Sequence, residues 1–198
     1  MLKNHMAKIE KWFPTTIYLE SDLFGPDQNL LWQTQVLEIQ KSTPTGGDEW
    51  EGQTYTTHST AYNILKDANF RPLVDAVTYH VNQYVKAHNS TKTYSCESAW
   101  LNIATNGNFQ EMHTHNESTI SAVYYISAPA GSGKIVFEDP REPDMLPIKD
   151  IPDRNELSYA KVGYQAAEGS LVIFRSYLRH MVSLNNNIDP RISVAFNF

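Results

Sequence analysis

The sequence predicts a mainly β fold, a sandwich or a jelly roll, flanked by helices from its N-terminal half. Three observations support this prediction. After residue 87 the chain is a series of short apolar runs with strand character. Turn signals rich in Gly, Pro and Asn separate these runs. Before residue 88, one segment instead repeats its apolar residues at helical spacing. Many short strands joined by tight turns are typical of two-layered β folds.

Length and composition fit a single domain that covers residues 1–198. A chain of 198 residues with 41% hydrophobic and 12% aromatic residues can bury one sizeable core. We expect residues 1–93 to supply a strand and supporting helices, and residues 94–198 to form the β core. The net charge of −6 argues against a nucleic-acid partner, because phosphate binding requires basic surfaces.

Cysteine content and apolar runs predict a cytoplasmic protein. The single Cys96 excludes an internal disulfide, which fits a reducing compartment. No apolar run approaches the roughly 18 to 20 residues that a membrane span needs. The N-terminal stretch M-L-K-N-H-M-A-K also lacks the apolar centre of a signal peptide. We therefore expect no membrane contact, and the sequence is compatible with a homodimer.

The N-terminal half is expected to contain one strand and two helices. Residues 9–19 have strand character, but Pro14 interrupts them and favours an edge position. Gly25-Pro26-Asp27 breaks the chain, and apolar spacing then predicts a helix over residues 30–40. A second helix is predicted over residues 72–87, where one apolar stripe repeats at helical spacing. The stripe consists of Leu73, Val77, Val81, Tyr84 and Val85.

The segment between the two helices has no clear periodicity. Residues 43–48 form a predicted loop, and residues 49–62 are polar and aromatic. We interpret the latter as a surface excursion rather than a lid over a substrate. His80 and His88 lie on or beside the second helix without a partner ligand four residues away. We interpret them as structural histidines.

Seven strand-like runs follow the second helix. They cover residues 98–104, 110–115, 119–127, 134–137, 170–174, 180–184 and 192–198. Turn signals lie between them at residues 106–108, 128–133, 139–144, 185–187 and 189–190. We expect the N-terminal helices to pack on the outer face of the larger sheet.

One stretch carries three potential metal ligands. In M-H-T-H-N-E-S, His113, His115 and Glu117 follow one another at every second position. Side chains two residues apart point to the same face of an extended segment. The three side chains would therefore face one way at the end of a strand.

Residues further along the chain strengthen the case for a metal site. His180 follows the run G-S-L-V-I-F-R-S-Y-L-R and begins another apolar strand. Arg191 lies eleven residues later and opens the last strand, R-I-S-V-A-F-N-F. Two ligands on one strand, a distant third and an arginine on a neighbouring strand form an ordered set that chance rarely produces.

This ordered set resembles the motif of the Fe(II)/2-oxoglutarate-dependent oxygenase superfamily. The segments W-L-N, H-T-H, I-S-A-V-Y-Y-I, V-F-E-D-P-R, G-S-L-V-I-F-R-S-Y-L-R-H and R-I-S-V-A-F-N resemble a branch of these oxygenases found in bacteria and marine phages. The resemblance implies a double-stranded β-helix, a cupin-like jelly roll. It also implies Fe(II) as cofactor, 2-oxoglutarate as cosubstrate and O₂ as oxidant. A phage-encoded protein would act in the cytoplasm of the host cell.

The chain departs from the usual ligand pattern of this superfamily, which is two histidines and one carboxylate. His115 stands where the superfamily normally has Asp or Glu. In a first register His113, His115 and His180 bind the metal. In a second register His115, Glu117 and His180 bind it. We favour the first, because a ligand at Glu117 would shorten the following loop, although a carboxylate would better offset the charge of iron.

Four further residues are implied in the binding of 2-oxoglutarate. Arg191 can hold the distal carboxylate through two parallel hydrogen bonds. Ser193 faces the same way and can donate to that carboxylate, and Tyr125 resembles a superfamily tyrosine with the same role. Asn102, on the W-L-N strand, is a candidate partner for the keto-acid end.

Two other charged motifs are interpreted as structural and not as parts of a catalytic site. Glu138 and Asp139 form a pair of carboxylates, but the D-P-R sequence that follows is first a turn signal. Arg179 precedes His180, and we interpret it as a solvated charge at a strand end. Cys96 has no basic neighbour that would lower its pKa, so nucleophilic chemistry is not expected.

Three classes of function are compatible with the sequence. The first is an oxygenase that couples 2-oxoglutarate decarboxylation to oxidation of a substrate C–H bond. The second is a cupin-like three-histidine metalloenzyme that does not use 2-oxoglutarate, which Arg191 and Ser193 disfavour. The third is a non-enzymatic jelly-roll binding module. The substrate could be a small molecule, a protein side chain or a nucleotide base.

Overall fold

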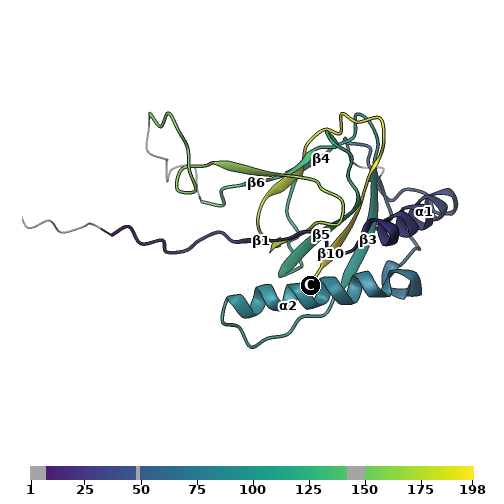
Figure 1. The fold of residues 1–198 in the computed structure, drawn as a ribbon, viewed down its shortest axis with the longest axis horizontal. Helices are drawn as coiled ribbons and strands as arrows, with labels where there is room; N and C mark the ends of the chain where they lie inside the picture. The colour runs from purple at the N-terminus through teal and green to yellow at the C-terminus, as the bar shows by residue number, and fades with distance from the viewer. Residues whose placement is uncertain (1–7, 48–49, 142–149) are drawn as a thin grey trace, which may run out of the picture.

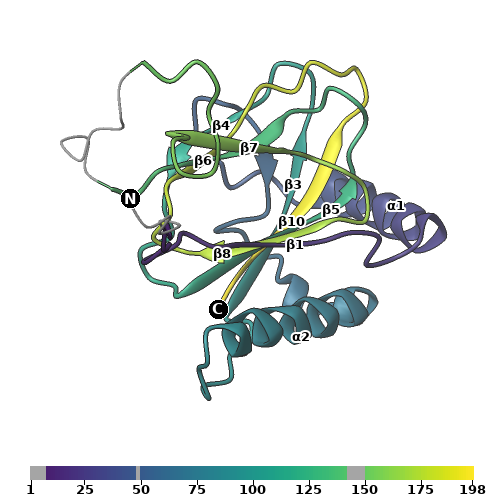
Figure 2. The same cartoon turned by 60° about the vertical axis from the view of Figure 1, so that its left-hand side comes forward.

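Two antiparallel sheets and two helices make up the computed structural model, which describes residues 8–47, 50–141 and 150–198. The larger sheet has the strand order β1-β8-β5-β10-β3-β2, and the smaller has the order β4-β9-β6-β7. Both helices lie on the outer side of the larger sheet (Figures 1 and 2). The strands are β1 Ile17–Glu20, β2 Tyr55–Thr56, β3 Ser98–Ala104, β4 Gln110–His113, β5 Ile120–Ser127, β6 Lys134–Glu138, β7 Lys161–Gln165, β8 Leu171–Arg175, β9 His180–Val182 and β10 Arg191–Asn197. The predicted mainly β fold with flanking helices is confirmed.

The two central strands of the larger sheet bury both of their faces. Along β10 the residues Ile192, Val194 and Phe196 pack into the core beneath the helices. The alternating residues Arg191, Ser193 and Ala195 face a cavity on the other side. β5 follows the same alternation. A strand covered on both faces is expected to be almost continuously apolar, as the I-S-A-V-Y-Y-I run of β5 is.

Helix α1 spans Pro26–Ser42, which is longer than the predicted 30–40. The Gly-Pro-Asp signal was interpreted as a break, but Gly25 is the N-cap and Pro26 occupies the first turn. Proline suits this position because its fixed φ is helical and its missing N–H would have no intrahelical partner. Trp32 anchors α1 in the core, where its indole N–H donates to the Asn69 carbonyl at 2.9 Å.

Helix α2 spans Arg71–Ala87 and confirms the second predicted helix. Its buried residues are the five of the predicted stripe, Leu73, Val77, Val81, Tyr84 and Val85. Two short 3₁₀ turns, η1 Ile64–Lys66 and η2 Ala68–Phe70, lead into it. None of the helices in the described ranges is both long and apolar enough to cross a membrane.

His80 and His88 are structural, as expected. His80 Nδ1 lies 2.8 Å from the Tyr18 hydroxyl of the edge strand β1. His88 Nδ1 lies 2.8 Å from the Tyr84 carbonyl and its Nε2 lies 3.0 Å from the Thr16 hydroxyl. Both histidines therefore tie α2 to the N-terminal segment.

Several strand boundaries differ from the prediction. Of the predicted 9–19 strand only residues 17–19 pair with the sheet, as part of the edge strand β1 Ile17–Glu20. Pro14 lies in the unpaired part, where its missing N–H could not join a ladder. β7 was not predicted, although K-V-G-Y-Q alternates weakly around Gly163. β4 ends at His113 rather than at residue 115. That early end alters the geometry of the site described below.

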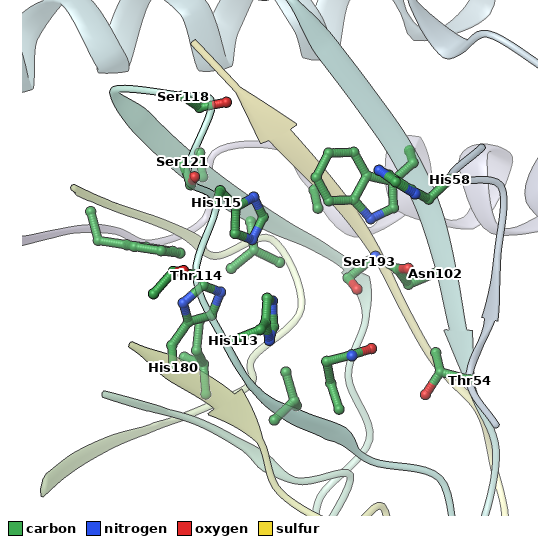
Figure 3. Close-up of a pocket in the computed structure, with 18 of the residues that line it drawn as sticks. Thr54, His58, Asn102, His113, Thr114, His115, Ser118, Ser121, His180 and Ser193 are labelled. Atoms are coloured by element: carbon green, nitrogen blue, oxygen red, sulfur yellow. The ribbon is translucent and has the colours of Figure 1, made fainter. Parts of the chain in front are cut away.

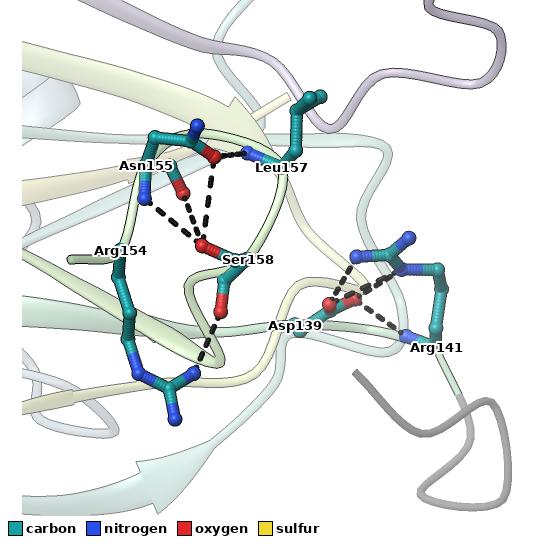
Figure 4. A network of polar contacts seen from close by, with 6 residues as sticks. All are labelled: Asp139, Arg141, Arg154, Asn155, Leu157 and Ser158. Atoms are coloured by element: carbon teal, nitrogen blue, oxygen red, sulfur yellow. Dashed lines mark hydrogen bonds and ion pairs between the residues drawn. The ribbon is translucent and has the colours of Figure 1, made fainter. Parts of the chain in front are cut away.

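The two carboxylates at the end of β6, Glu138 and Asp139, are held in surface ion pairs. Asp139 accepts from the Arg141 Nε at 2.9 Å, and this pair lies near an Asn155–Ser158 turn (Figure 4). Glu138 lies 3.2 Å from both Lys161 and Arg179. The structural interpretation of Glu138, Asp139 and Arg179 is therefore confirmed. Parts of the predicted 43–48 and 139–144 turns, and residue 49, lie outside the described residues.

Candidate metal centre

A cavity of about 400 Å³ lies between the two sheets. Strands β3, β5 and β10 form one wall, and strands β4, β6 and β9 contribute to the other. All residues that the sequence singled out as candidates line this cavity. They are Asn102, His113, His115, Glu117, Tyr125, His180, Arg191 and Ser193.

Three histidines gather at one end of the cavity (Figure 3). Each offers one ring nitrogen, and these nitrogens of His113, His115 and His180 lie within 4.8 Å of one another. His113 ends β4 and is the direct cross-strand partner of His180, which begins β9. His115 lies two residues beyond β4, where its backbone N–H donates to the Ser176 carbonyl at 3.0 Å. The antiparallel pairing thus brings together residues that are far apart in sequence.

Hydrogen bonds determine which nitrogen of each imidazole is free. The Nδ1 atoms of His113 and His180 lie 2.7 and 2.9 Å from the carbonyls of Glu111 and Leu178. A carbonyl can only accept, so both Nδ1 atoms carry the proton. His115 Nδ1 lies 2.8 Å from the Asn197 Oδ1. This arrangement leaves the Nε2 lone pairs of His113 and His180 available to a metal ion, and that of His115 as well when its Nδ1 donates to Asn197. Such outer hydrogen bonds are typical of metal-binding histidines.

Burial and mutual proximity keep the three imidazoles neutral. Burial lowers the pKa of all three histidines. The positive charge that His113 would carry lowers the pKa values of the other two further, to about 4 for His115 and about 3 for His180. A metal requires the neutral form of imidazole, so at neutral pH no proton competes with it.

The same pKa shifts predict how the stability of the metal-free protein depends on pH. Because the folded-state pKa values lie below the unfolded value of about 6.5, the unfolded state takes up protons first as the pH falls. The contribution of the three histidines to the free energy of unfolding should be constant above about pH 6.5. Below it, stability should fall by up to about 1.4 kcal/mol per pH unit for each buried histidine, down to the folded pKa.

Urea unfolding at pH 7.5, 6 and 5 measures this dependence. The matched control is a variant with Asn at positions 113, 115 and 180, which retains the titrating carboxylates. It should lose less stability over the same interval. Equal losses in the two proteins would show that the histidines are not the cause.

Glu117 does not join the histidines. Its side chain is exposed at the rim of the cavity, and the group of potential ligands found among the described residues is made of the three histidines alone. The prediction that His113, His115 and Glu117 share one face of a strand is therefore wrong for Glu117. The strand ends at His113, and residues 115–118 turn, with the Ser118 N–H donating to the His115 carbonyl at 3.1 Å. The alternation of an extended segment therefore does not reach Glu117.

Three polar residues form a row across the larger sheet. Ser193 on β10 is the cross-strand partner of Asn102 on β3 and of Tyr125 on β5. Directly opposite residues of neighbouring strands face the same side, so all three side chains enter the cavity. Figure 3 shows Asn102 and Ser193 beside each other, on the other side of His113 from His180. Burial raises the pKa of Tyr125 to about 12, so its phenol stays a hydrogen-bond donor.

Arg191 lies two residues before Ser193 on the same face of β10 and is 4% exposed. Its Nη1 donates to the Ser132 carbonyl, and among the described residues no carboxylate pairs with it. Gly133, at φ +97°, packs closely at this point, because a Cβ there would clash with the Ser183 carbonyl oxygen and lie 2.9 Å from Nη1 of Arg191. The register between β5 and β10 shifts next to Arg191. Such irregularities commonly redirect a side chain beside an active site.

A buried guanidinium that has no carboxylate partner among the described residues indicates the binding of an anion. Burial lowers the pKa of Arg191, but a guanidinium remains charged at neutral pH. A buried charge is costly unless a partner offsets it. The donor set therefore fits both expected groups: three free Nε2 atoms fit a divalent metal, and Arg191 with its polar row fits a carboxylate.

The interpretation of residues 49–62 as a surface excursion was wrong for part of the segment. Trp50, Thr54 and His58 line the cavity. His58 packs edge-on against Trp100 at 4.9 Å between ring centroids, and Trp100 stacks on His115 at 5.7 Å. The concentration of aromatic residues in an otherwise polar segment was the available signal.

A comparison with protein families assigns the chain. The sequence profile of the family described as "Putative 2OG-Fe(II) oxygenase" matches residues 98–197, just over half of the 198 residues. The fold and the three-histidine cluster define a metal-binding jelly-roll protein. The chain belongs to this family. It is thus an oxidoreductase that uses iron and 2-oxoglutarate, as predicted. A search of curated proteins found no sequence match.

Solved structures share the fold at low sequence identity. HygX from Streptomyces hygroscopicus, with nickel and 2-oxoglutarate bound, has a TM-score of 0.66 at 12% identity, with 92% of this chain and 82% of that chain covered. A Pseudomonas putida prolyl-4-hydroxylase has a TM-score of 0.63 at 12% identity, with 92% of each chain covered. The viral collagen prolyl hydroxylase of Paramecium Bursaria Chlorella virus-1 has a TM-score of 0.57 at 9% identity, with 91% of this chain and 94% of that chain covered. The predicted jelly roll is confirmed.

Proposed function

We propose that His113, His115 and His180 bind Fe(II) through Nε2, and that Arg191 binds the distal carboxylate of 2-oxoglutarate. The enzyme would then couple decarboxylation of 2-oxoglutarate to succinate and CO₂ with the oxidation of a substrate C–H bond by O₂. One observation carries the proposal: three imidazole nitrogens share one cavity with a buried guanidinium that has no carboxylate partner in the part of the chain that the structure describes.

The polar row supports a defined orientation of the cosubstrate. The Ser193 hydroxyl and the Tyr125 phenol, on neighbouring strands, can donate to the carboxylate that Arg191 holds. The Asn102 amide, beside Ser193 in the same cavity, can donate to the keto-acid end. Fe(II) would hold the keto acid and activate O₂, which is chemistry that no side chain of the cavity supplies.

Charge balance also favours a dianionic cosubstrate. Three neutral imidazoles leave the charge of a divalent metal uncompensated, and Arg191 adds a further positive charge. The two carboxylates of 2-oxoglutarate would offset two of these three charges inside a cavity where each costs solvation energy. A three-histidine enzyme without 2-oxoglutarate would leave Arg191 without a carboxylate partner among residues 8–47, 50–141 and 150–198.

Anaerobic titration tests the proposal. Addition of 2-oxoglutarate to the Fe(II)-loaded protein should produce a weak visible charge-transfer band that saturates at one equivalent. Exposure to O₂ should then yield succinate. If the metal raises the melting temperature but 2-oxoglutarate neither raises it further nor gives the band, the cupin-like alternative is favoured. Absence of any metal binding would favour the non-enzymatic binding module.

Some expectations from the sequence are carried forward as proposals. We infer that the substrate is a small molecule or a protein side chain that enters past Trp50, His58 and Glu117 at the cavity wall. A cytoplasmic location, homodimer formation, the division into 1–93 and 94–198 within one domain, and the bacterial or phage branch also stay predictions.

A further inference from the structure

His115 differs from the other two histidines in how its ring is held. His113 and His180 each donate from Nδ1 to the backbone carbonyl two residues earlier. These contacts are local, and no side-chain substitution removes them. The Nδ1 partner of His115 is a side chain, the Oδ1 of Asn197, which is 82 residues away in the sequence. The orientation of His115 therefore depends on residue 197.

Asn197 is part of a closed hydrogen-bond network. Its Oδ1 also accepts from the Ser121 hydroxyl at 2.9 Å, and that hydroxyl lies 2.8 Å from the hydroxyl of Ser176. The Ser176 carbonyl in turn accepts from the backbone N–H of His115 at 3.0 Å. Ser121 and Ser176 are at most 1% exposed, so water does not replace these contacts. The ring and backbone of His115 are thus attached to the same small network.

The sheet register explains how these residues meet. Asn197 ends β10 on the cavity side and is the cross-strand partner of Ser121 on β5. On another side, Trp100 stacks on the His115 ring with an interplanar angle of 23°. The stack limits tilting of the ring but cannot determine which nitrogen carries the proton. Only the hydrogen-bond network can do that.

Two proton arrangements are compatible with the positions of the heavy atoms. In the first, Ser176 donates to Ser121, and Ser121 and His115 both donate to the amide oxygen of Asn197. In the second, the amide is reversed, its NH₂ donates to both neighbours, and His115 carries its proton on Nε2. The second arrangement would block the nitrogen that faces the other histidines. The first leaves it free.

We propose that Asn197, supported by Ser121 and Ser176, is a positioning residue that fixes His115 in the Nδ1–H tautomer and directs its Nε2 toward the metal. The metal-binding part of this inference rests on the proposed function, in which His115 is a ligand. The tautomer part does not, because it concerns the metal-free protein.

The tautomer is measured first, in metal-free protein labelled with ¹⁵N-histidine. At pH 8, long-range ¹H–¹⁵N correlation spectra should show His115 with a protonated Nδ1 and an unprotonated Nε2. In Asn197→Ala the two tautomers of His115 should mix, whereas His113 and His180 should keep their signals. A wild-type His115 with its proton on Nε2 would overturn the proposal, even if the variant failed to fold.

Metal affinity is measured second, by anaerobic competition for Fe(II) with a chromogenic chelator. Loss of a hydrogen-bond partner outside the ligands typically lowers metal affinity about 10–100-fold, and Asn197→Ala should fall in this range. Asn197→Asp keeps an oxygen acceptor and should bind at least as tightly as the wild type. Unchanged affinity in Asn197→Ala, or a loss of affinity in Asn197→Asp as large as in Asn197→Ala, would contradict the proposal.

Asn82→Ala is the matched control for lost stability. Asn82 lies on α2, away from the cavity. Its side-chain amide makes two hydrogen bonds of 2.9 Å with the backbone of Tyr94, one as donor and one as acceptor. This variant should lower the melting temperature and leave Fe(II) affinity unchanged. If the wild type bound no metal at all, the proposed function would fail while the tautomer spectra still decided the role of Asn197.

Discussion

Replacement of Arg191 by Ala should strongly weaken 2-oxoglutarate binding while the protein still binds its metal. Arg191 is the one cation among the described residues of the cavity wall that can pair with the distal carboxylate. Truncation of one partner of a buried, hydrogen-bonded charge pair costs about 2–5 kcal/mol. We therefore expect the affinity for 2-oxoglutarate to fall by about 100-fold or more. Anaerobic calorimetry on the Fe(II)-loaded protein would measure the change.

Two further variants separate charge from geometry. Arg191→Lys keeps the positive charge but loses the two parallel hydrogen bonds, so it should recover only part of the affinity. Arg179→Ala removes an arginine that is exposed and paired with Glu138, and it should leave 2-oxoglutarate affinity unchanged. Wild-type affinity in Arg191→Ala would contradict the clamp, and equal losses in both alanine variants would point to a non-specific effect of charge.

The main parts of the site could be predicted because they lie on regular strands in a fixed order. The H-T-H motif lies where one strand ends, whereas His180 and Arg191 each begin a strand. Antiparallel pairing then brings such strand ends together, and His113 pairs directly with His180. The alternation of Arg191 and Ser193 on β10 likewise follows from strand periodicity. These features need only local sequence and the rules of sheet pairing.

The remaining parts depend on geometry that has no local signal. Glu117 was a candidate because the strand was expected to continue past His113, and the turn at residues 115–118 removes it from the cluster. Asn197 was seen only as part of a motif, because its contact with His115 requires the register of β10 on β5. Trp50 and His58 reach the cavity from a segment without periodicity. In each case a turn or a long-range pairing decides the outcome.

The ligand set can be decided by comparing two single substitutions. In the proposed site His113 is a ligand and Glu117 is not, whereas in the alternative register the reverse holds. His113→Ala should lower Fe(II) affinity by more than about 100-fold, because even the loss of an outer hydrogen-bond partner costs about 10–100-fold. Glu117→Ala should leave the affinity within a factor of about two, since this exposed carboxylate could add only a weakly screened, long-range attraction.

Chelator competition under anaerobic conditions provides both values, and His80→Ala serves as the histidine control. His80 bonds to Tyr18 on the far side of the larger sheet, so its loss should affect stability alone. The reverse result, with affinity lost in Glu117→Ala and kept in His113→Ala, would require residues 115–118 to refold around the metal. In that event the neutral three-histidine set, and the charge argument for a dianionic cosubstrate that follows from it, would both have to be abandoned.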